Sequence, residues 1–110
     1  MSLDLSFYGE PRVVTPLIDD FNITHNLVPM AKEVGLYEVL WYPEETGIGR
    51  AEKLLPFLKR AKDTMIRDKQ ELEKLNPKNN WGSYDSFLKT INELIIFCKE
   101  YPDATVESSR

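Results

Sequence analysis

The strongest constraint on the fold is a long apolar face between Ser83 and Pro102. Seven residues recur along it at the spacings of three and four that are typical of a helix with one buried side: Tyr84, Phe87, Leu88, Ile91, Leu94, Ile95 and Cys98. Ile96 and Phe97 widen this face, so we expect the most buried helix of the chain here. Ser83 is the expected N-cap, Asp85 complements the helix dipole, and Pro102 ends the helix. Apolar residues make up 42% of the 110, and five Phe, five Tyr and two Trp are enough to anchor a core.

Short alternating segments near both ends of the chain predict a small antiparallel sheet. Residues 3–8 alternate between apolar and polar side chains, as a half-buried strand does. Residues 9–11 indicate a turn, and residues 12–18 are expected to form the second strand. Because Pro16 donates no hydrogen bond to a neighbouring strand, that strand should lie at an edge or carry a bulge. Residues 104–107 alternate again and predict a third strand beside this hairpin.

Shorter helices are predicted between the hairpin and the long apolar face. Residues 26–34 fit a short helix with Asn26 as its N-cap and Pro29 in its first turn, where a missing N–H costs little. Gly35 is expected to end this helix as its C′ residue. Residues 36–42 add two further helical turns.

The middle of the chain, residues 50–75, keeps a broadly helical spacing of apolar residues. Pro56 should kink this helix near its first turns. Lys69 stands where the apolar stripe should continue, so the pattern also allows a break or bend between residues 66 and 72. Taken together, these segments predict the α+β class. Three or four helices pack on an antiparallel sheet made from the N-terminal hairpin and the C-terminal strand, and residues 1–110 form a single domain.

Charge and composition argue against several classes of protein. The net charge of −4 argues against a dedicated nucleic-acid-binding protein. Residues 50–75 hold eight Lys and Arg against five Asp and Glu, whereas the rest of the chain holds six against thirteen. The basic segment is either a solvated helix with mixed ion pairs or a weak basic face for an acidic partner.

One cysteine and one histidine exclude an intramolecular disulfide and leave almost no ligands for zinc. We therefore expect no metal and no cofactor. No apolar run approaches the roughly 18 residues of a membrane span, and the N-terminus lacks the pattern of a signal peptide. The expected compartment is the cytoplasm, without contact to a membrane.

Candidate site residues gather in three polar and aromatic segments, at 19–26, 41–45 and 79–84. Two of them precede predicted helices, whose N-termini supply unpaired N–H groups for an anion or a carbonyl, and aromatic side chains can wall such a site. We expect the three segments to meet around one site, formed by Asp20, Asn22, Thr24, His25, Asn26, Trp41, Glu44, Asn80, Trp81, Ser83 and Tyr84. The alternative for each segment alone is structural, because Asn and Ser are ordinary helix caps and Trp commonly anchors a core.

His25 is the candidate for acid–base chemistry. A carboxylate such as Asp20 on one ring nitrogen would set its tautomer and orient it as a general base. The alternative is a structural histidine that ties a loop through hydrogen bonds. Cys98 lies on the most buried predicted face and fits an inert core thiol, and Ser83 fits a cap. The chain has no G-x-S-x-G, Walker A, G-x-G-x-x-G or H-E-x-x-H motif.

Two strings, N-I-T-H-N-L at residues 22–27 and N-x-W-G-S-Y at residues 79–84, resemble a family of short proteins from phage and bacterial genomes. The resemblance extends over roughly residues 17–110. Tyr42 departs from it, since an arginine is expected there, and this removes one group able to pair with an anion. The resemblance implies a phage or mobile-element setting and supplies no reaction.

Two functions follow from these observations. The first is a non-enzymatic binding or interaction protein, an accessory factor of phage or prophage origin with a protein or small-molecule partner. The alternative is a small enzyme, a hydrolase or transferase, that uses His25 with Asp20.

Overall fold

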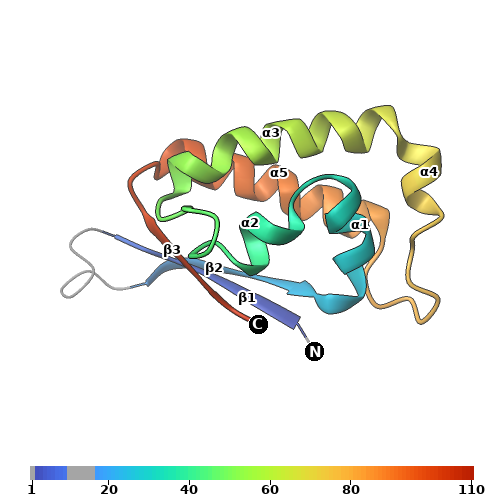
Figure 1. The fold of residues 1–110 in the computed structure, drawn as a ribbon, viewed down its shortest axis with the longest axis horizontal. Coiled ribbons are helices and arrows are strands. Elements are labelled where there is room, and N and C mark those ends of the chain that lie inside the picture. Colours follow the sequence, from blue (N-terminus) through green and yellow to red (C-terminus); the bar gives the residue numbers. More distant parts are fainter. Residues whose placement is uncertain (1, 10–16) are drawn as a thin grey trace.

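The computed structural model describes residues 2–9 and 17–110 of the chain (Figure 1). The helices lie on one side of a three-stranded antiparallel sheet, which confirms the predicted α+β class. The elements, in chain order, are β1 (Ser2–Tyr8), β2 (Leu17–Thr24), the 3₁₀-helix η1 (His25–Leu27), α1 (Val28–Glu33), α2 (Tyr37–Trp41), α3 (Ala51–Arg67), α4 (Lys69–Glu73), α5 (Tyr84–Glu100) and β3 (Thr105–Ser109).

The sheet has the order β2-β1-β3, with β1 in its centre. β1 pairs with β2 along its whole length and with β3 over residues 4–8, so the predicted hairpin and C-terminal strand are both confirmed. Leu3, Leu5 and Phe7 of β1 are completely buried against the helices. Alternate side chains of a strand point to opposite faces, so the residues between them lie on the uncovered face.

The expected end of the second strand at residue 18 is wrong, because β2 continues to Thr24. Residues 10–16, which hold the predicted turn and Pro16, lie outside the described residues. In β2, Phe21 and Ile23 lie opposite Leu5 and Leu3 and so face the helices. Their polar neighbours face the open side of the sheet. This segment therefore alternates as a half-buried strand does. Its many polar residues are the reason that the sequence did not predict a strand here.

α5 contacts both the sheet and α3, and forms the centre of the core. The Phe97 ring packs on Phe7 and Phe21, with centroids 4.6 and 5.8 Å apart. At the other end, the Tyr84 hydroxyl donates a hydrogen bond of 2.6 Å to the backbone carbonyl of Met65 in α3. The expectation that Ile96 widens the apolar face is wrong, since its side chain is 65% exposed.

The chain passes from α1 to α2 through Gly35, whose φ of +77° suits a residue without a Cβ. The Gly35 N–H bonds to the Lys32 carbonyl, and the Leu36 N–H bonds to the Ala31 carbonyl. These two bonds form a Schellman motif, which confirms the predicted helix end. The predicted N-cap is wrong: Thr24 caps η1 by accepting from the Asn26 N–H, and α1 continues directly from η1.

The predicted break in the middle segment is also confirmed. α3 ends at Arg67, Asp68 leaves the helical conformation with ψ +32°, and α4 follows. Pro56 lies inside α3, which continues through it to Arg67. The side chains of Arg67 and Asp68 pair at 3.0 Å beside this break. No helix among the described residues has the length and apolar character needed to cross a membrane.

Candidate functional site

The first predicted segment is divided between the sheet and a helix start. Asp20 and Asn22 lie in β2 on the open face of the sheet, and both are exposed. The Asn22 amide donates to the hydroxyl of Ser2 and to the carboxylate of Asp4, at 2.8 and 2.7 Å. Thr24 serves as the cap of η1. Asn22 and Thr24 therefore have structural roles, whereas Asp20 lies exposed on the open face of the sheet.

His25 and Trp41 lie beside each other, as expected, with ring centroids 6.2 Å apart. The His25 Nε2 and the Trp41 Nε1 are both buried and have no hydrogen-bond partner among the described residues. Trp41 is only 2% exposed and Tyr37 stacks on it. No hydrogen bond joins His25 to Asp20 within residues 2–9 and 17–110; the Asp20 N–H bonds instead to the Asp19 carboxylate.

Glu44 binds a residue that the sequence did not single out, Arg110. The Arg110 Nη1 donates to the Glu44 Oε1 and to the Trp41 carbonyl, at 2.7 Å each. Its guanidinium carbon lies 4.3 Å from the centre of the Tyr42 ring. The hydrogen bond from Arg110 lowers the pKa of Glu44, and the same contact raises the pKa of Arg110. A carboxylate, a helix-end carbonyl and an aromatic face therefore surround one guanidinium group.

The third segment lies between α4 and α5, and two of its residues are structural. Ser83 forms a capping box with Ser86: its hydroxyl accepts from the Ser86 N–H, and the Ser86 hydroxyl accepts from the Ser83 N–H. Tyr84 is buried and is bonded to α3 as described above. Asn80 has a φ of +62°, which is uncommon for a residue other than glycine.

The loop at residues 79–82 contacts the first segment through Gly82. A Cβ built on Gly82 would lie 2.7 Å from the Thr24 Cγ2 and 3.0 Å from the Leu27 Cγ, so this backbone packs closely on the start of η1. Trp81, the next residue back, is 67% exposed. Its ring makes no aromatic contact with His25 or Trp41 among the described residues. The first and third segments therefore touch through Gly82, whereas the Trp81 side chain, which was expected to share a site with His25 and Trp41, is mostly exposed to solvent.

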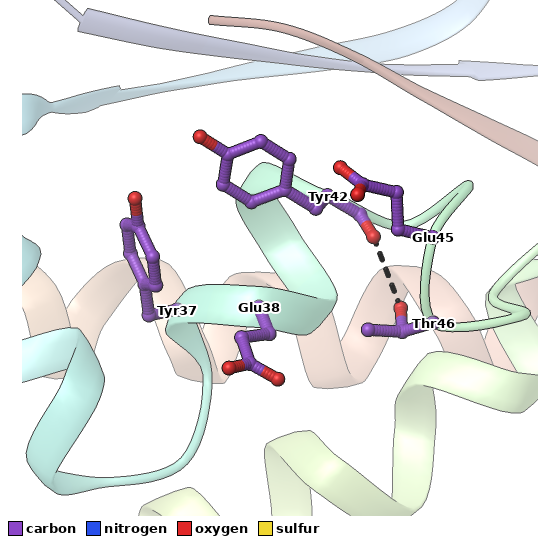
Figure 2. Close-up of a pocket in the computed structure, with 5 residues that line it drawn as sticks. All are labelled: Tyr37, Glu38, Tyr42, Glu45 and Thr46. Atoms are coloured by element: carbon purple, nitrogen blue, oxygen red, sulfur yellow. Dashed lines mark hydrogen bonds between the residues drawn. The ribbon is translucent and has the colours of Figure 1, made fainter.

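A hollow that the sequence did not predict lies beside α2 (Figure 2). Its volume is about 470 Å³, and its lining consists of Tyr37, Glu38, Tyr42, Glu45 and Thr46. We call it the Tyr37–Tyr42 hollow. Lys32 and Phe57 help to line an adjoining hollow that shares Tyr37, Glu38 and Thr46 with it. The segment 41–45 pointed to this region, but Tyr37 and Glu38 lie one helical turn earlier and carry no separate signal.

The two tyrosines of the hollow influence each other. Their ring centroids are 5.8 Å apart and the rings meet edge to face. The neighbouring Tyr37 hydroxyl raises the pKa of Tyr42. The Lys32 ammonium lies 4.9 Å from the centre of the Tyr37 ring. Each of these rings therefore already has a cation of the chain near it.

Cys98 is an unreactive thiol of the core, as its place on α5 predicted. Its side chain is completely buried, and burial raises its pKa to about 12. No three His, Cys, Asp or Glu side chains in the described part of the chain gather as ligands for a metal ion.

Comparison of the chain with protein-family models, with curated proteins and with solved structures finds no match. The geometry of its own residues is therefore the basis for a proposal about its function.

Proposed function

We propose that this chain is a non-enzymatic interaction protein, an accessory factor of phage or mobile-element origin, that binds a protein partner through Trp81. The phage setting rests on the resemblance of the strings at residues 22–27 and 79–84. The interaction role rests on a separate observation, the exposure of Trp81 on a loop with defined contacts. The partner's chemistry follows from the side chain: an apolar cleft with an acceptor for the indole N–H.

Trp81 exposes 67% of its surface, although tryptophan is the largest apolar side chain available to a core. Tryptophan is enriched among the few interface residues that carry most of the binding energy, and it loses little conformational entropy on binding because it has two rotatable bonds. An exposed indole therefore marks a contact for a partner better than the isolated exposed Ile66 or Ile96 on a helix does.

The loop around Trp81 is held at three points. The Asn79 side chain accepts from the Trp81 N–H at 3.0 Å, and the Asn76 side chain accepts from the Tyr84 N–H at 2.7 Å. The third point is the close contact of Gly82 with Thr24. A loop that is ordered before binding loses less entropy when the partner arrives, and more of the contact energy remains as affinity.

The test compares the wild type with Trp81→Ala and with a matched control, Ile96→Ala, since Ile96 is 65% exposed on α5. Tagged proteins capture partners from a lysate of the bacterium that carries the coding sequence. Each protein captured by the wild type is then purified, and its affinity for the wild type and for both variants is measured by calorimetry.

We expect Trp81→Ala to weaken that affinity by roughly 30-fold or more, the size of an interface hot spot, and Ile96→Ala to change it less than about twofold. Circular dichroism of both variants should match the wild type. Equal affinity of Trp81→Ala and the wild type for every purified partner would contradict the proposal.

The alternative, a small hydrolase or transferase, has one supporting observation in the unpartnered Nε2 of His25. In the part of the chain that the structure describes, no hydrogen bond joins His25 to Asp20, and the thiol of Cys98 is buried. His25→Ala separates the two roles: loss of folding supports a structural histidine, whereas intact folding with loss of a measured activity supports catalysis.

A further inference from the structure

We infer that the Tyr37–Tyr42 hollow binds an organic cation, the guanidinium or ammonium group of a basic side chain or of a small amine. This site is separate from Trp81 and goes beyond the interaction role proposed for that residue. The inference rests on the charge of the hollow, on its aromatic lining and on an arginine of this chain that is bound next to it.

The charge of the lining is negative. Glu38 and Glu45 are exposed, and neither carboxylate has an ion-pair partner among the described residues. Glu44, which precedes Glu45 in the turn after α2, differs because Arg110 already pairs with it. In Figure 2 the Glu45 carboxylate lies next to the Tyr42 ring, whereas the Glu38 carboxylate lies on the other side of α2 and points away from both rings. Glu45 therefore supplies the acceptor beside the rings, and Glu38 adds to the negative charge of the lining.

The aromatic lining suits the same class of ligand. A cation within about 6 Å of the centre of an aromatic ring is attracted by the negative face of the ring. The Lys32 ammonium occupies such a position on Tyr37 at 4.9 Å, and the Arg110 guanidinium occupies one on Tyr42 at 4.3 Å. Lys32 is exposed and has no described ion pair, so an incoming cation can exchange with it on the Tyr37 ring.

Arg110 shows what this end of α2 recognises. Its guanidinium group lies over the Tyr42 ring and donates hydrogen bonds to the Glu44 carboxylate and the Trp41 carbonyl. The Tyr37–Tyr42 hollow offers the same kinds of group, aromatic rings and carboxylates, and Tyr42 also belongs to its lining. Its volume of about 470 Å³ lies within the range of ligand sites and admits an arginine side chain with water.

The turn after α2 keeps this shape fixed before a ligand binds. The Thr46 hydroxyl donates to the carbonyls of Tyr42 and Pro43, at 3.1 and 3.2 Å. The Glu45 N–H bonds to the Tyr42 carbonyl, and the Ile48 N–H bonds to that of Pro43. Tyr42, Glu45 and Thr46 therefore belong to one hydrogen-bonded unit.

The experiment is a titration of the ¹⁵N-labelled chain, followed by the backbone amide signals in NMR spectra at low ionic strength. The ligands are agmatine, the peptide amide Gly-Arg-Gly, and the same peptide with citrulline, a neutral isostere, in place of arginine. We expect the signals of Tyr37, Glu38, Glu45 and Thr46 to shift saturably with both cations, with a dissociation constant of about 1 mM.

Variants of the lining give changes of opposite sign. Glu38→Gln and Glu45→Gln should each weaken binding roughly two- to fivefold, whereas Lys32→Gln should tighten it by a similar factor, because it vacates the Tyr37 ring. The matched control is Glu93→Gln, which makes the same change in net charge by removing an exposed carboxylate on α5. It should leave the affinity unchanged. Trp81→Ala should also leave it unchanged.

Tighter binding of the arginine peptide than of agmatine assigns the site to a basic peptide, and the reverse assigns it to a small amine; either result supports the inference. Equal shifts with the citrulline peptide would overturn it, since the charge would then be irrelevant. So would the absence of shifts at about 20 mM ligand, or an equal loss of affinity in Glu93→Gln, because binding would then follow net charge alone.

Discussion

Replacing Gly82 with alanine tests whether the Trp81 loop is fixed against the start of η1. Gly82 has a φ of +93°, and an added Cβ would lie 2.7 Å from the Thr24 Cγ2 and 3.0 Å from the Leu27 Cγ. Side chains rarely adopt this backbone conformation, and the Thr24 methyl group is attached directly to its own Cβ. Either the loop or the β2–η1 junction must therefore move.

The magnitude has two parts. The left-handed backbone conformation costs about 1–2 kcal/mol for a residue with a Cβ. Insertion of a methyl group into a packed contact costs about 1–3 kcal/mol more. Together they predict a loss of roughly 2–5 kcal/mol in the free energy of unfolding for Gly82→Ala. For a domain of this size that corresponds to a decrease in Tm of about 8–20 °C.

Gly35→Ala is the matched control. Gly35 also has a positive φ, +77°, but nothing lies within 4 Å of its added Cβ. Only the backbone part applies there, about 1–2 kcal/mol. The difference between the two variants isolates the contact between the Trp81 loop and Thr24.

The assay is urea unfolding followed by circular dichroism, for the two single variants and for a suppressor. Thr24→Ser removes the Cγ2 methyl group and keeps the hydroxyl oxygen that accepts the Asn26 N–H. In the double variant Thr24→Ser, Gly82→Ala, we expect a favourable coupling of about 1 kcal/mol. Equal losses in Gly82→Ala and Gly35→Ala, with no coupling to Thr24→Ser, would refute the close contact.

Three further predictions follow from other parts of the fold. Ser83→Ala removes the capping box of α5 and should lower the free energy of unfolding by about 1 kcal/mol in urea titrations, whereas an unchanged midpoint would contradict the role of the cap. Cys98 should react with a thiol reagent at pH 8 only when the protein unfolds, since burial raises its pKa to about 12; rapid labelling of the native protein would be inconsistent with this. Arg110→Gln should raise the pKa of Glu44 toward its ordinary value in an NMR titration of the carboxyl carbon. A carboxyl whose pKa is lower in the folded than in the unfolded state stabilises the fold above the unfolded-state pKa, and this stabilisation is lost as the pH falls through the native pKa. The difference in stability between the wild type and Arg110→Gln should therefore shrink below about pH 4. A larger difference in acid would contradict the role of Arg110.

Local signals predicted the helices well. The apolar repeat of α5 covers its whole length, and Ser83 caps it through bonds to a residue three positions away. Gly35 ends α1 through bonds within six residues, and the polar Lys69 interrupts the apolar stripe where the chain breaks between α3 and α4. In each case the residues that decide the structure are neighbours in the sequence.

The second strand was predicted poorly because one of its faces is open to solvent. Phe21 and Ile23 are its inward residues, and the polar residues around them were assigned to a candidate site instead of to the strand. Because helices cover only one side of this three-stranded sheet, β2 needs apolar side chains on one face alone. Its other face can be polar, so a largely polar segment can still form a strand.

The sites depend on contacts between distant residues, which local patterns do not contain. Arg110 and Glu44 are 66 positions apart, and Gly82 contacts Thr24 although the two residues lie far apart in the sequence. The two tryptophans have similar polar and aromatic neighbours in the sequence, yet Trp41 is 2% exposed and Trp81 is 67% exposed. Trp41 ends α2 and packs against His25 and Tyr37, whereas Trp81 lies in the loop between α4 and α5.

The central claim is that Trp81 is an exposed side chain on a loop ordered before any partner binds, and the ¹⁵N relaxation of the Trp81 backbone amide tests it most directly. The bonds at Asn79 and Asn76 and the contact at Gly82 predict an order parameter near 0.85, equal to that of the α5 amides. An order parameter below about 0.6 would mean that the loop moves freely on the nanosecond timescale, and would contradict the account.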